Sequence, residues 1–176
     1  LEVLAERGSE AKVLAGGQSL VPLMNFRLVR PQCLIDINGL ADLGYVRLAN
    51  GDLAIGGLTR QSELLRSSLV KAQCPLLAYA ARFISHPAVR NRGTVGGSVA
   101  HADPAAELPG LFLALDAEFT ARSTQGERKI PVGDLFVTYF TTSLDPTELL
   151  TEVRIPALAP NTGWGFEETS RRHGDL

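Results

Sequence analysis

A glycine-rich stretch at residues 90–109, RNRGTVGGSVAHADPAAELP, constrains the fold of this 176-residue chain more than any other segment. Glycine adopts backbone conformations that a residue with a Cβ atom avoids, and it lets another group approach the main chain closely. Short hydroxyl side chains stand beside these glycines and their N–H groups. The residues with these properties are Gly93, Gly96, Gly97, Thr94 and Ser98. Such a stretch favours close contact with a large polar ligand.

The end of this stretch carries the signal for a helix start. Pro104 fits the first turn of a helix, where no N–H group is needed, and residues 105–115 are predicted to form the helix body. The positive end of this helix would face the glycines. We therefore predict that residues 90–109 form a cradle for phosphate and ribose groups.

A second glycine pair follows the first predicted strand. Residues 12–15 are predicted to form a short buried strand, Gly16 and Gly17 a turn, and residues 20–28 a helix. In this arrangement main-chain N–H groups converge on an anion. A lone glycine pair after a strand is usually only a tight turn. Two such pairs, each followed closely by a serine, favour one extended ligand with two phosphates.

Neither segment matches the two best-known phosphate loops. No lysine follows residues 16–17, as a Walker A loop requires. The dinucleotide fingerprint Gly-x-Gly-x-x-Gly is absent too, because the glycines of residues 93–97 have a different spacing. The glycine pair at residues 56–57 lacks a following hydroxyl and is interpreted as a structural turn.

Local patterns predict the other elements. Before the glycine-rich stretch they are a helix over residues 3–8, a strand over 33–38 and a hairpin of 45–48 and 52–55. These are followed by a helix through residue 67 with Thr59 as its N-cap, a buried helix over 76–84 begun by Pro75, and a loop over 85–89. After that stretch they are a hairpin of 118–122 and 129–132, a helical piece over 133–139, a strand over 149–155, a linker over 156–163 and the start of a last strand over 164–169. The order helix, strand, helix, strand predicts a small α/β lobe over residues 1–38.

The composition restricts the class of partner. The chain is 45% hydrophobic and 20% charged, with a net charge of −2. A nearly neutral chain gives no electrostatic reason to expect a nucleic acid or a membrane surface as partner. No apolar run approaches the roughly 20 residues of a transmembrane helix, and no signal peptide is recognised. Because the chain begins at Leu1, we expect a fragment of a longer protein.

The cysteines and histidines indicate neither a metal site nor a catalytic base. Cys33 and Cys74 lie far apart, outside any Cys-x-x-Cys pattern, so a zinc or iron–sulfur site is not expected. Unpaired thiols fit a reducing cytoplasm. We assign no catalytic role to His86, His101 or His173. Loop arginines such as those at residues 90–92 approach a ligand or, more commonly, form surface ion pairs.

Four segments resemble one known family in their order and spacing. They are residues 15–20, AGGQSL; residues 22–24, PLM, with Arg27; residues 92–98, RGTVGGS; and residues 101–109, HADPAAELP. These segments are similar to the FAD-binding medium subunit of molybdenum hydroxylases, the group of xanthine dehydrogenase and aerobic carbon monoxide dehydrogenase. The bacterial carbon monoxide dehydrogenase type is the most similar. The resemblance runs from Lys12 to Asp175, nearly the whole chain.

The resemblance implies a fold and a division into domains. It implies an α+β, two-lobed FAD-binding fold of the PCMH type, which is shared with vanillyl-alcohol oxidases. A small α/β lobe would span residues 1–38 and a larger lobe, a mixed sheet with helices, residues 39–160. Residues 161–176 would form a linker and the start of a truncated C-terminal domain.

The resemblance also implies an activity that belongs to an assembly. The chain would be the flavin subunit of an oxidoreductase and would pass electrons from iron–sulfur clusters through FAD to an external acceptor. The molybdenum cofactor would lie on a large partner subunit and the 2Fe–2S clusters on a small one, in a dimer of heterotrimers in the cytoplasm. One alternative is a stand-alone flavoprotein oxidoreductase of the same fold; another is a scaffold that keeps the fold without flavin.

Site residues follow from the resemblance position by position. Two glycine segments would hold the diphosphate and the ribityl chain, Glu107 would accept a hydrogen bond from a ribose hydroxyl, and no residue is implied as catalytic or metal-binding. The complete expected FAD-binding set is Leu14, Ala15, Gly16, Gly17, Gln18, Ser19, Leu20, Thr94, Gly96, Gly97, Ser98, Ala102, Asp103, Glu107 and Leu150. The chain departs from the family at Glu167, where some relatives have lysine, and at Leu176, where many members of this type have an aromatic residue.

Overall fold

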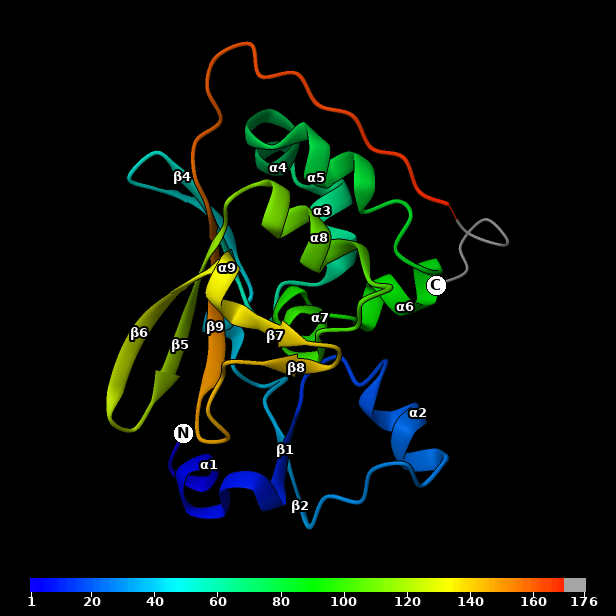
Figure 1. Ribbon diagram of the computed structural model, residues 1–176, viewed down its shortest axis with the longest axis vertical. Helices are drawn as coiled ribbons and strands as arrows, with labels where there is room; N and C mark the ends of the chain where they lie inside the picture. Colours follow the sequence, from blue (N-terminus) through cyan, green and yellow to red (C-terminus); the bar gives the residue numbers. More distant parts are fainter. Residues whose placement is uncertain (170–176) are drawn as a thin grey trace.

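The computed structural model describes residues 1–169 as an α+β fold with a small parallel sheet, a larger antiparallel sheet and a short two-stranded ribbon (Figure 1). The α+β class is as predicted. The expectations for His173 and Leu176 lie outside the described residues. None of the helices formed by residues 1–169 has the length and apolar character that a membrane crossing requires. Cys33 and Cys74 are both free thiols.

The N-terminal part builds the parallel sheet. Its elements are α1 (Glu2–Arg7), the 3-10 turn η1 (Gly8–Glu10), β1 (Ala11–Leu14), α2 (Leu20–Asn25) and β2 (Cys33–Asp36). β1 and β2 pair in parallel, with Ala11 opposite Cys33 and Leu14 opposite Asp36. Parallel strands need a crossover connection, and α2 lies in it. Because both strands end at the same edge of the sheet, the segments after Leu14 and Asp36 lie together.

The antiparallel sheet is built from segments far apart in the sequence. Its order is β3–β4–β9–β5–β6, with β3 (Val46–Ala49), β4 (Asp52–Gly56), β5 (Glu118–Ser123), β6 (Gly126–Pro131) and β9 (Leu149–Ile155). Asn50 and Gly51 turn the first hairpin with φ angles of 56° and 94°, as the hairpin prediction requires. β9 pairs with β4 on one side and β5 on the other, so it is the central strand that joins the two hairpins.

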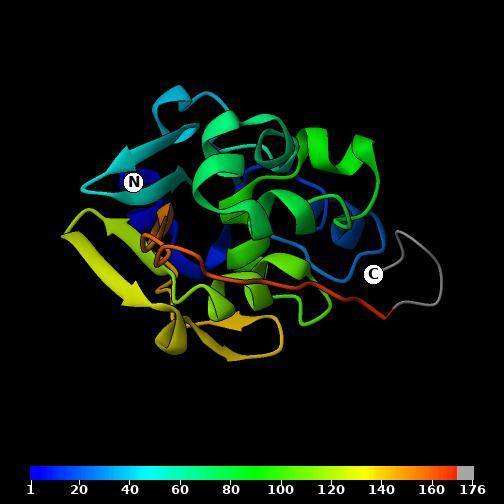
Figure 2. The same ribbon diagram turned by 90° about the horizontal axis from the view of Figure 1, so that it is seen from above.

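Helices lie on one side of this sheet, as the view from above shows (Figure 2). They are α3 (Gln61–Arg66), α4 (Ser68–Gln73), α5 (Pro75–Ala80), α6 (Pro87–Arg92), α7 (Val95–His101), α8 (Glu107–Ala114) and the short α9 (Val132–Leu135). Phe112 of α8 and Phe119 of β5 are both fully buried and meet edge to face, with ring centroids 5.8 Å apart. Buried aromatic pairs of this kind contribute much of the stabilising burial in a core.

The two sheets fall within the two predicted lobes. β1 and β2 lie inside residues 1–38, and all five strands of the larger sheet lie inside residues 39–160. The bounds of the lobes themselves, and the C-terminal range 161–176, stay predictions.

The glycine-rich stretch departs most from its predicted structure. Residues 85–103 contain α6, which begins at Pro87, and α7, where a continuous loop was expected. Pro104 does not open the following helix; residues 103–106 form a turn, and α8 begins at Glu107. The loop was predicted because glycine has a low helix propensity. In the folded protein, tertiary contacts stabilise α7 in spite of this propensity.

Thr59 is not the N-cap of α3. Its hydroxyl donates to the carbonyl of Tyr45 at 2.7 Å and accepts from the N–H of Tyr45 at 3.1 Å. The helix begins two residues later, and Arg60 occupies the N-cap position without a side-chain cap. The hydroxyl thus joins the segment before α3 to the segment before β3.

Two later elements also differ from their prediction. After the single turn of α9, residues predicted as helical form β7 (Phe136–Thr138), which pairs with β8 (Thr141–Thr142). Residues 164–169 form no strand. This segment runs as extended chain beside the helices (Figure 1), with Trp164 5.5 Å from the Tyr79 ring and Phe166 5.1 Å from the Phe83 ring. Aromatic packing, not β pairing, holds it in place.

The face of the large sheet away from the helices carries an ionic network around Glu152. This residue is only 6% exposed, and its carboxylate accepts from the Tyr45 hydroxyl at 2.7 Å and from Arg154 Nη2 at 2.9 Å. Burial alone would raise the pKa of Glu152, but these hydrogen bonds outweigh it and hold the pKa below its usual value. Burial and the neighbouring carboxylate raise the pKa of Tyr45 to about 12.

We expect Glu152→Gln to lower the free energy of unfolding at pH 7 by about 1–3 kcal/mol, because the arginine then lacks its carboxylate partner. A lowered folded-state pKa stabilises the protein above the unfolded pKa of about 4.3, and this stabilisation is lost as the pH falls through the folded-state pKa. The difference between wild type and variant, measured by urea denaturation, should therefore shrink as the pH falls from 7 to 3.

Glu127→Gln is the matched control for this measurement. Glu127 pairs with Arg122 at 2.7 Å, but its side chain is 40% exposed, so the change should be about 1 kcal/mol or less. A stability difference for Glu152→Gln that grows towards acid pH would contradict the expected sign.

Candidate functional site

The loop after β1 presents a row of main-chain N–H groups without partners. Within residues 1–169, the N–H groups of Gly16, Gly17, Gln18 and Ser19 donate no hydrogen bond to a protein acceptor. Gly17 has a φ angle of 71°, in the left-handed region, and the Gln18 side chain donates back to the Gly16 carbonyl at 3.1 Å. Successive N–H groups in such a turn form a concave anion-binding site.

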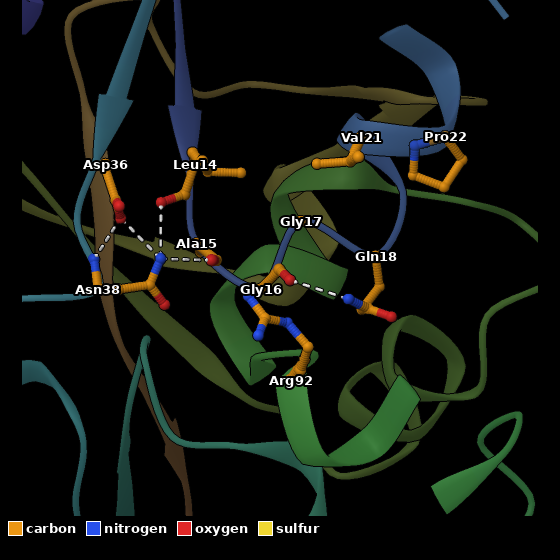
Figure 3. A pocket seen from close by; sticks show the side chains of 10 residues that line it. All are labelled: Leu14, Ala15, Gly16, Gly17, Gln18, Val21, Pro22, Asp36, Asn38 and Arg92. Carbon is orange, nitrogen blue, oxygen red and sulfur yellow. Dashed lines mark hydrogen bonds between the residues drawn. The ribbon is translucent and has the colours of Figure 1, made fainter. Parts of the chain in front are cut away.

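This loop forms one wall of a pocket of about 390 Å³, drawn in Figure 3. The other lining side chains come from the start of α2, from the end of β2 and from the end of α6. The lining residues are Leu14, Ala15, Gly16, Gly17, Gln18, Val21, Pro22, Asp36, Asn38 and Arg92. Five of the expected site residues, Leu14 to Gln18, therefore line one pocket.

Arg92 brings positive charge to this pocket. Its side chain lies beside Gly16 in Figure 3, and within the described residues its guanidinium has no hydrogen-bond acceptor or carboxylate partner. Arg90 differs, since its Nη1 donates to the carbonyls of Ile84 and Ser85 at 2.7 Å each. Of the two arginines, Arg92 is thus the one whose charge is available to an anion.

The second glycine segment is the first turn of α7, not an open loop. Thr94 is the N-cap, and its hydroxyl accepts from the Gly97 N–H at 3.1 Å. The N–H groups of Val95 and Gly96 donate to the carbonyls of Thr59 and Gly57, at 2.9 Å each. The N–H groups of this turn are therefore already used within the protein, unlike those of residues 16–19.

Two glycines allow the segments to meet. A Cβ atom on Gly16 would lie 2.5 Å from the Arg92 carbonyl oxygen and 2.8 Å from the Gly93 Cα atom. A Cβ atom on Gly97 would lie 3.9 Å from the Cβ atom of Ala15. The structure thus brings the two predicted glycine segments side by side, although only the first offers free N–H donors.

The remaining expected site residues lie in several environments. Ser19 and Leu20 lead into α2, and Ser98 lies in α7. Ala102 ends α7 in the left-handed conformation with φ 51°, and the Asp103 carboxylate accepts from the Ala105 N–H at 2.9 Å. Leu150 is 6% exposed and belongs to the hydrophobic core under the large sheet, so it does not line the pocket.

Glu107 is the first residue of α8 and is half-buried. Burial raises the pKa of its carboxyl group above the usual value, and its own main-chain N–H opposes this by hydrogen bonding to the carboxylate. The nearby charge of Arg90 also lowers the pKa, and a half-buried carboxylate is suited to accept a hydrogen bond from a donor such as a hydroxyl.

Asp36, Asn38 and Arg92 line the pocket but were not among the expected site residues. The Asp36 carboxylate accepts from the Asn38 N–H at 2.9 Å and from its side-chain Nδ2 at 2.7 Å, and these bonds lower the pKa of Asp36. The sequence could have indicated Asp36 and Asn38, because polar residues at the ends of parallel strands gather at one edge of the sheet.

The pocket carries no constellation for acid–base or metal chemistry. Among residues 1–169, no group of three or more histidine, cysteine, aspartate or glutamate side chains is placed to hold a metal ion. His101 packs against the Phe140 ring at 5.2 Å, and His86 is the N-cap of α6; neither lines the pocket. The donors that line the pocket, the free N–H groups after β1 and the guanidinium of Arg92, are suited to an anion.

Comparison with known proteins gives a consistent result. Residues 1–158 match the family described as "FAD binding domain in molybdopterin dehydrogenase". The chain is 53% identical over 175 residues to the 6-hydroxypseudooxynicotine dehydrogenase complex subunit alpha of Paenarthrobacter nicotinovorans, covering 99% of this chain and 59% of that protein. It is 42% identical over 173 residues to the carbon monoxide dehydrogenase medium chain of Hydrogenophaga pseudoflava, covering 98% and 60%.

Solved structures show the same fold. The H. pseudoflava carbon monoxide dehydrogenase that lacks the Mo-pyranopterin moiety superposes with a TM-score of 0.96 at 42% identity, over 99% of this chain and 61% of that chain. Quinoline 2-oxidoreductase from Pseudomonas putida 86 superposes with a TM-score of 0.94 at 38% identity, over 99% and 60%. The chain therefore spans about 60% of the length of these relatives.

We expect Gly16→Ala to lower the free energy of unfolding by about 1–3 kcal/mol, because the new methyl group would overlap the main chain of Arg92 and Gly93. Thermal or urea denaturation measures this change. Gly110→Ala is the control: Gly110 lies exposed inside α8 with open space around it, so alanine should stabilise the protein by about 0.5–1 kcal/mol. Equal effects of the two substitutions would show that the close contact at Gly16 is not rigid.

Proposed function

Since this chain belongs to the family of FAD-binding domains of molybdopterin dehydrogenases, we propose that it binds FAD with the diphosphate in the pocket after β1. The row of unpaired N–H groups on residues 16–19 carries this proposal. A diphosphate offers several oxygen acceptors close together, and neutral N–H donors with one guanidinium match its charge. The absence of a Cβ atom at Gly16 lets this loop approach the main chain of Arg92 and Gly93, and Gly17 turns the loop with a φ angle of 71°.

The expected residues divide by what they would do. Residues 15–19 and Arg92 would hold the diphosphate, and Thr94, Gly96, Gly97 and Ser98 would border it beside Ala15. Glu107 would accept from a ribose hydroxyl, and Ala102 and Asp103 would line the site near the ring system. Leu14 and Leu20 would flank the loop, and Leu150 would contact the adenine or flavin part of the ligand. FAD, when bound, supplies reversible one- and two-electron oxidation and reduction.

We propose further that the chain is the FAD-binding part of an oxidoreductase assembly of the carbon monoxide dehydrogenase and xanthine dehydrogenase kind. Its relatives are described as a complex subunit and as a medium chain, which supports partner subunits. A large subunit would carry the molybdenum cofactor and a small subunit the 2Fe–2S clusters, in a dimer of heterotrimers. The free cysteines are consistent with a reducing cytoplasm. Asp36 is the one carboxylate among the pocket-lining residues and is hydrogen-bonded to Asn38, which disfavours a stand-alone flavoenzyme with its own acid or base.

The first test is an absorbance spectrum of the purified chain with and without added FAD. We expect the protein to be yellow or to become yellow, and we expect Gly97→Val to abolish binding. A side chain at residue 97 would lie 2.7 Å from the capping hydroxyl of Thr94 and would point towards Ala15. Gly110→Val, in open space on α8, should bind FAD normally. A colourless protein that ignores FAD would overturn the proposal.

The second test concerns the charge of Arg92. Arg92→Met should weaken FAD binding by about tenfold or more, since a charge-assisted hydrogen bond to phosphate is lost. The affinity of the wild type should also fall more steeply with salt than that of the variant. Arg122→Met, which removes an arginine paired with Glu127 on the large sheet, is the control. Fluorescence titration of FAD measures the affinities of the wild type and of both variants. Equal affinities of the wild type and Arg92→Met would exclude a role for Arg92.

A further inference from the structure

The two segments of the pocket touch without bonding to each other directly. In the described part of the chain, no hydrogen bond joins residues 15–19 to residues 90–98. Their contact is steric, between Gly16 and the main chain of Arg92 and Gly93. A steric contact sets a minimum distance but does not hold two segments together. Their separation needs another interaction to maintain it.

Arg60 supplies a bridge between these segments. One guanidinium nitrogen, Nη1, donates to the carbonyl of Arg92, and the other, Nη2, donates to Asn38 Oδ1 at 2.8 Å. Asn38 Nδ2 in turn donates to the Ala15 carbonyl at 2.8 Å. The path Arg92–Arg60–Asn38–Ala15 thus connects the two walls of the pocket through side chains.

The partners of Asn38 fix its orientation in this bridge. Asp36 Oδ1 accepts from both Asn38 N–H groups, the main-chain one at 2.9 Å and the side-chain one at 2.7 Å. Because Nδ2 faces the oxygens of Asp36 and Ala15, Oδ1 must face Arg60, which has only donors. Exchange of the two amide atoms would break the bonds of the Asn38 side chain to Arg60 and to Ala15.

Arg60 occupies a helix position at which other residue types are preferred. It is the N-cap of α3, where serine, threonine, aspartate and asparagine are preferred because their side chains accept hydrogen bonds. An arginine side chain cannot accept, and this one turns to the loops instead. The main chain beside it is fixed to the same segment, since the Gln61 N–H donates to the Gly93 carbonyl at 2.9 Å and Arg60 pairs with Thr94.

We propose that Arg60 is a positioning residue for the cofactor: through Asn38 it holds the Ala15–Ser19 loop at the distance from Arg92 at which both reach one diphosphate. Arg60 does not line this pocket, so it acts through the carbonyls of Arg92 and Ala15. The inference rests on the proposed function for the identity of the ligand. The bridge consists of protein groups alone, which allows the two to be tested separately.

The test measures the affinity of the full chain for FAD and for ADP by calorimetry. ADP keeps the diphosphate and lacks the flavin, so it isolates the part of the ligand that the bridge serves. Arg60→Met should weaken both ligands by about tenfold or more, because bonds from a charged donor are lost on both sides of the pocket. Arg60→Lys should restore part of the affinity, since an ammonium group can still donate. Adding Asn38→Ala to Arg60→Met should have little further effect.

Arg66→Met is the matched control on the same helix, because within residues 1–169 the Arg66 guanidinium donates only to Asn91, at 3.5 Å. It should leave both affinities unchanged. In the ligand-free protein, the amide resonances of Gly16, Gly17 and Gly93 should shift or broaden in Arg60→Met and not in Arg66→Met.

Unchanged affinities in Arg60→Met, with or without a lower melting temperature, would overturn the inference, as would unperturbed glycine resonances. If the wild type binds neither FAD nor ADP, the proposed function fails, whereas the glycine resonances still decide whether Arg60 positions the loop.

Discussion

The steric contact between Gly16 and the main chain of Arg92 and Gly93 is the interaction on which the site depends. A side chain at residue 16 would overlap the Arg92 carbonyl, so the small parallel sheet could not approach the α6–α7 junction. A second contact of the same kind joins that junction to the large sheet, because a Cβ atom on Gly96 would lie 2.8 Å from the Gly57 carbonyl oxygen. Close approach of backbone segments at glycines therefore places the loop after β1 beside the α6–α7 junction, where the pocket forms.

The sequence predicts elements well where a local signal decides them. Asn50 and Gly51 favour positive φ angles and so define the first hairpin. Apolar and polar residues alternate in the predicted strand, and β9 ends at Ile155, directly before Pro156. α7 could not be predicted in the same way. Its glycines disfavour a helix, and the Thr94 cap and the contact of Gly96 with Gly57 overcome this only in the folded protein. The strand order of the large sheet likewise depends on pairing between distant segments.

The same difference between local signals and tertiary contacts applies to the candidate site. The glycine segments were recognised from their residues, and they lie together as a shared ligand requires. Arg60 and Asn38 belong to no local motif, and their importance appears only when the end of β2 and the start of α3 are seen in space. Leu150 was expected near the ligand by resemblance alone; its side chain lies in the core, and its role at the site stays a prediction.

The extended segment after β9 has a spectroscopic consequence. Trp164 is the single tryptophan of the chain, and it is held against Tyr79 by aromatic packing without any β pairing. Indole emission responds to the polarity around the ring, so it reports selectively on whether this segment lies along the helices. Detachment of the segment can thus be observed as an optical event separate from the unfolding of the two sheets.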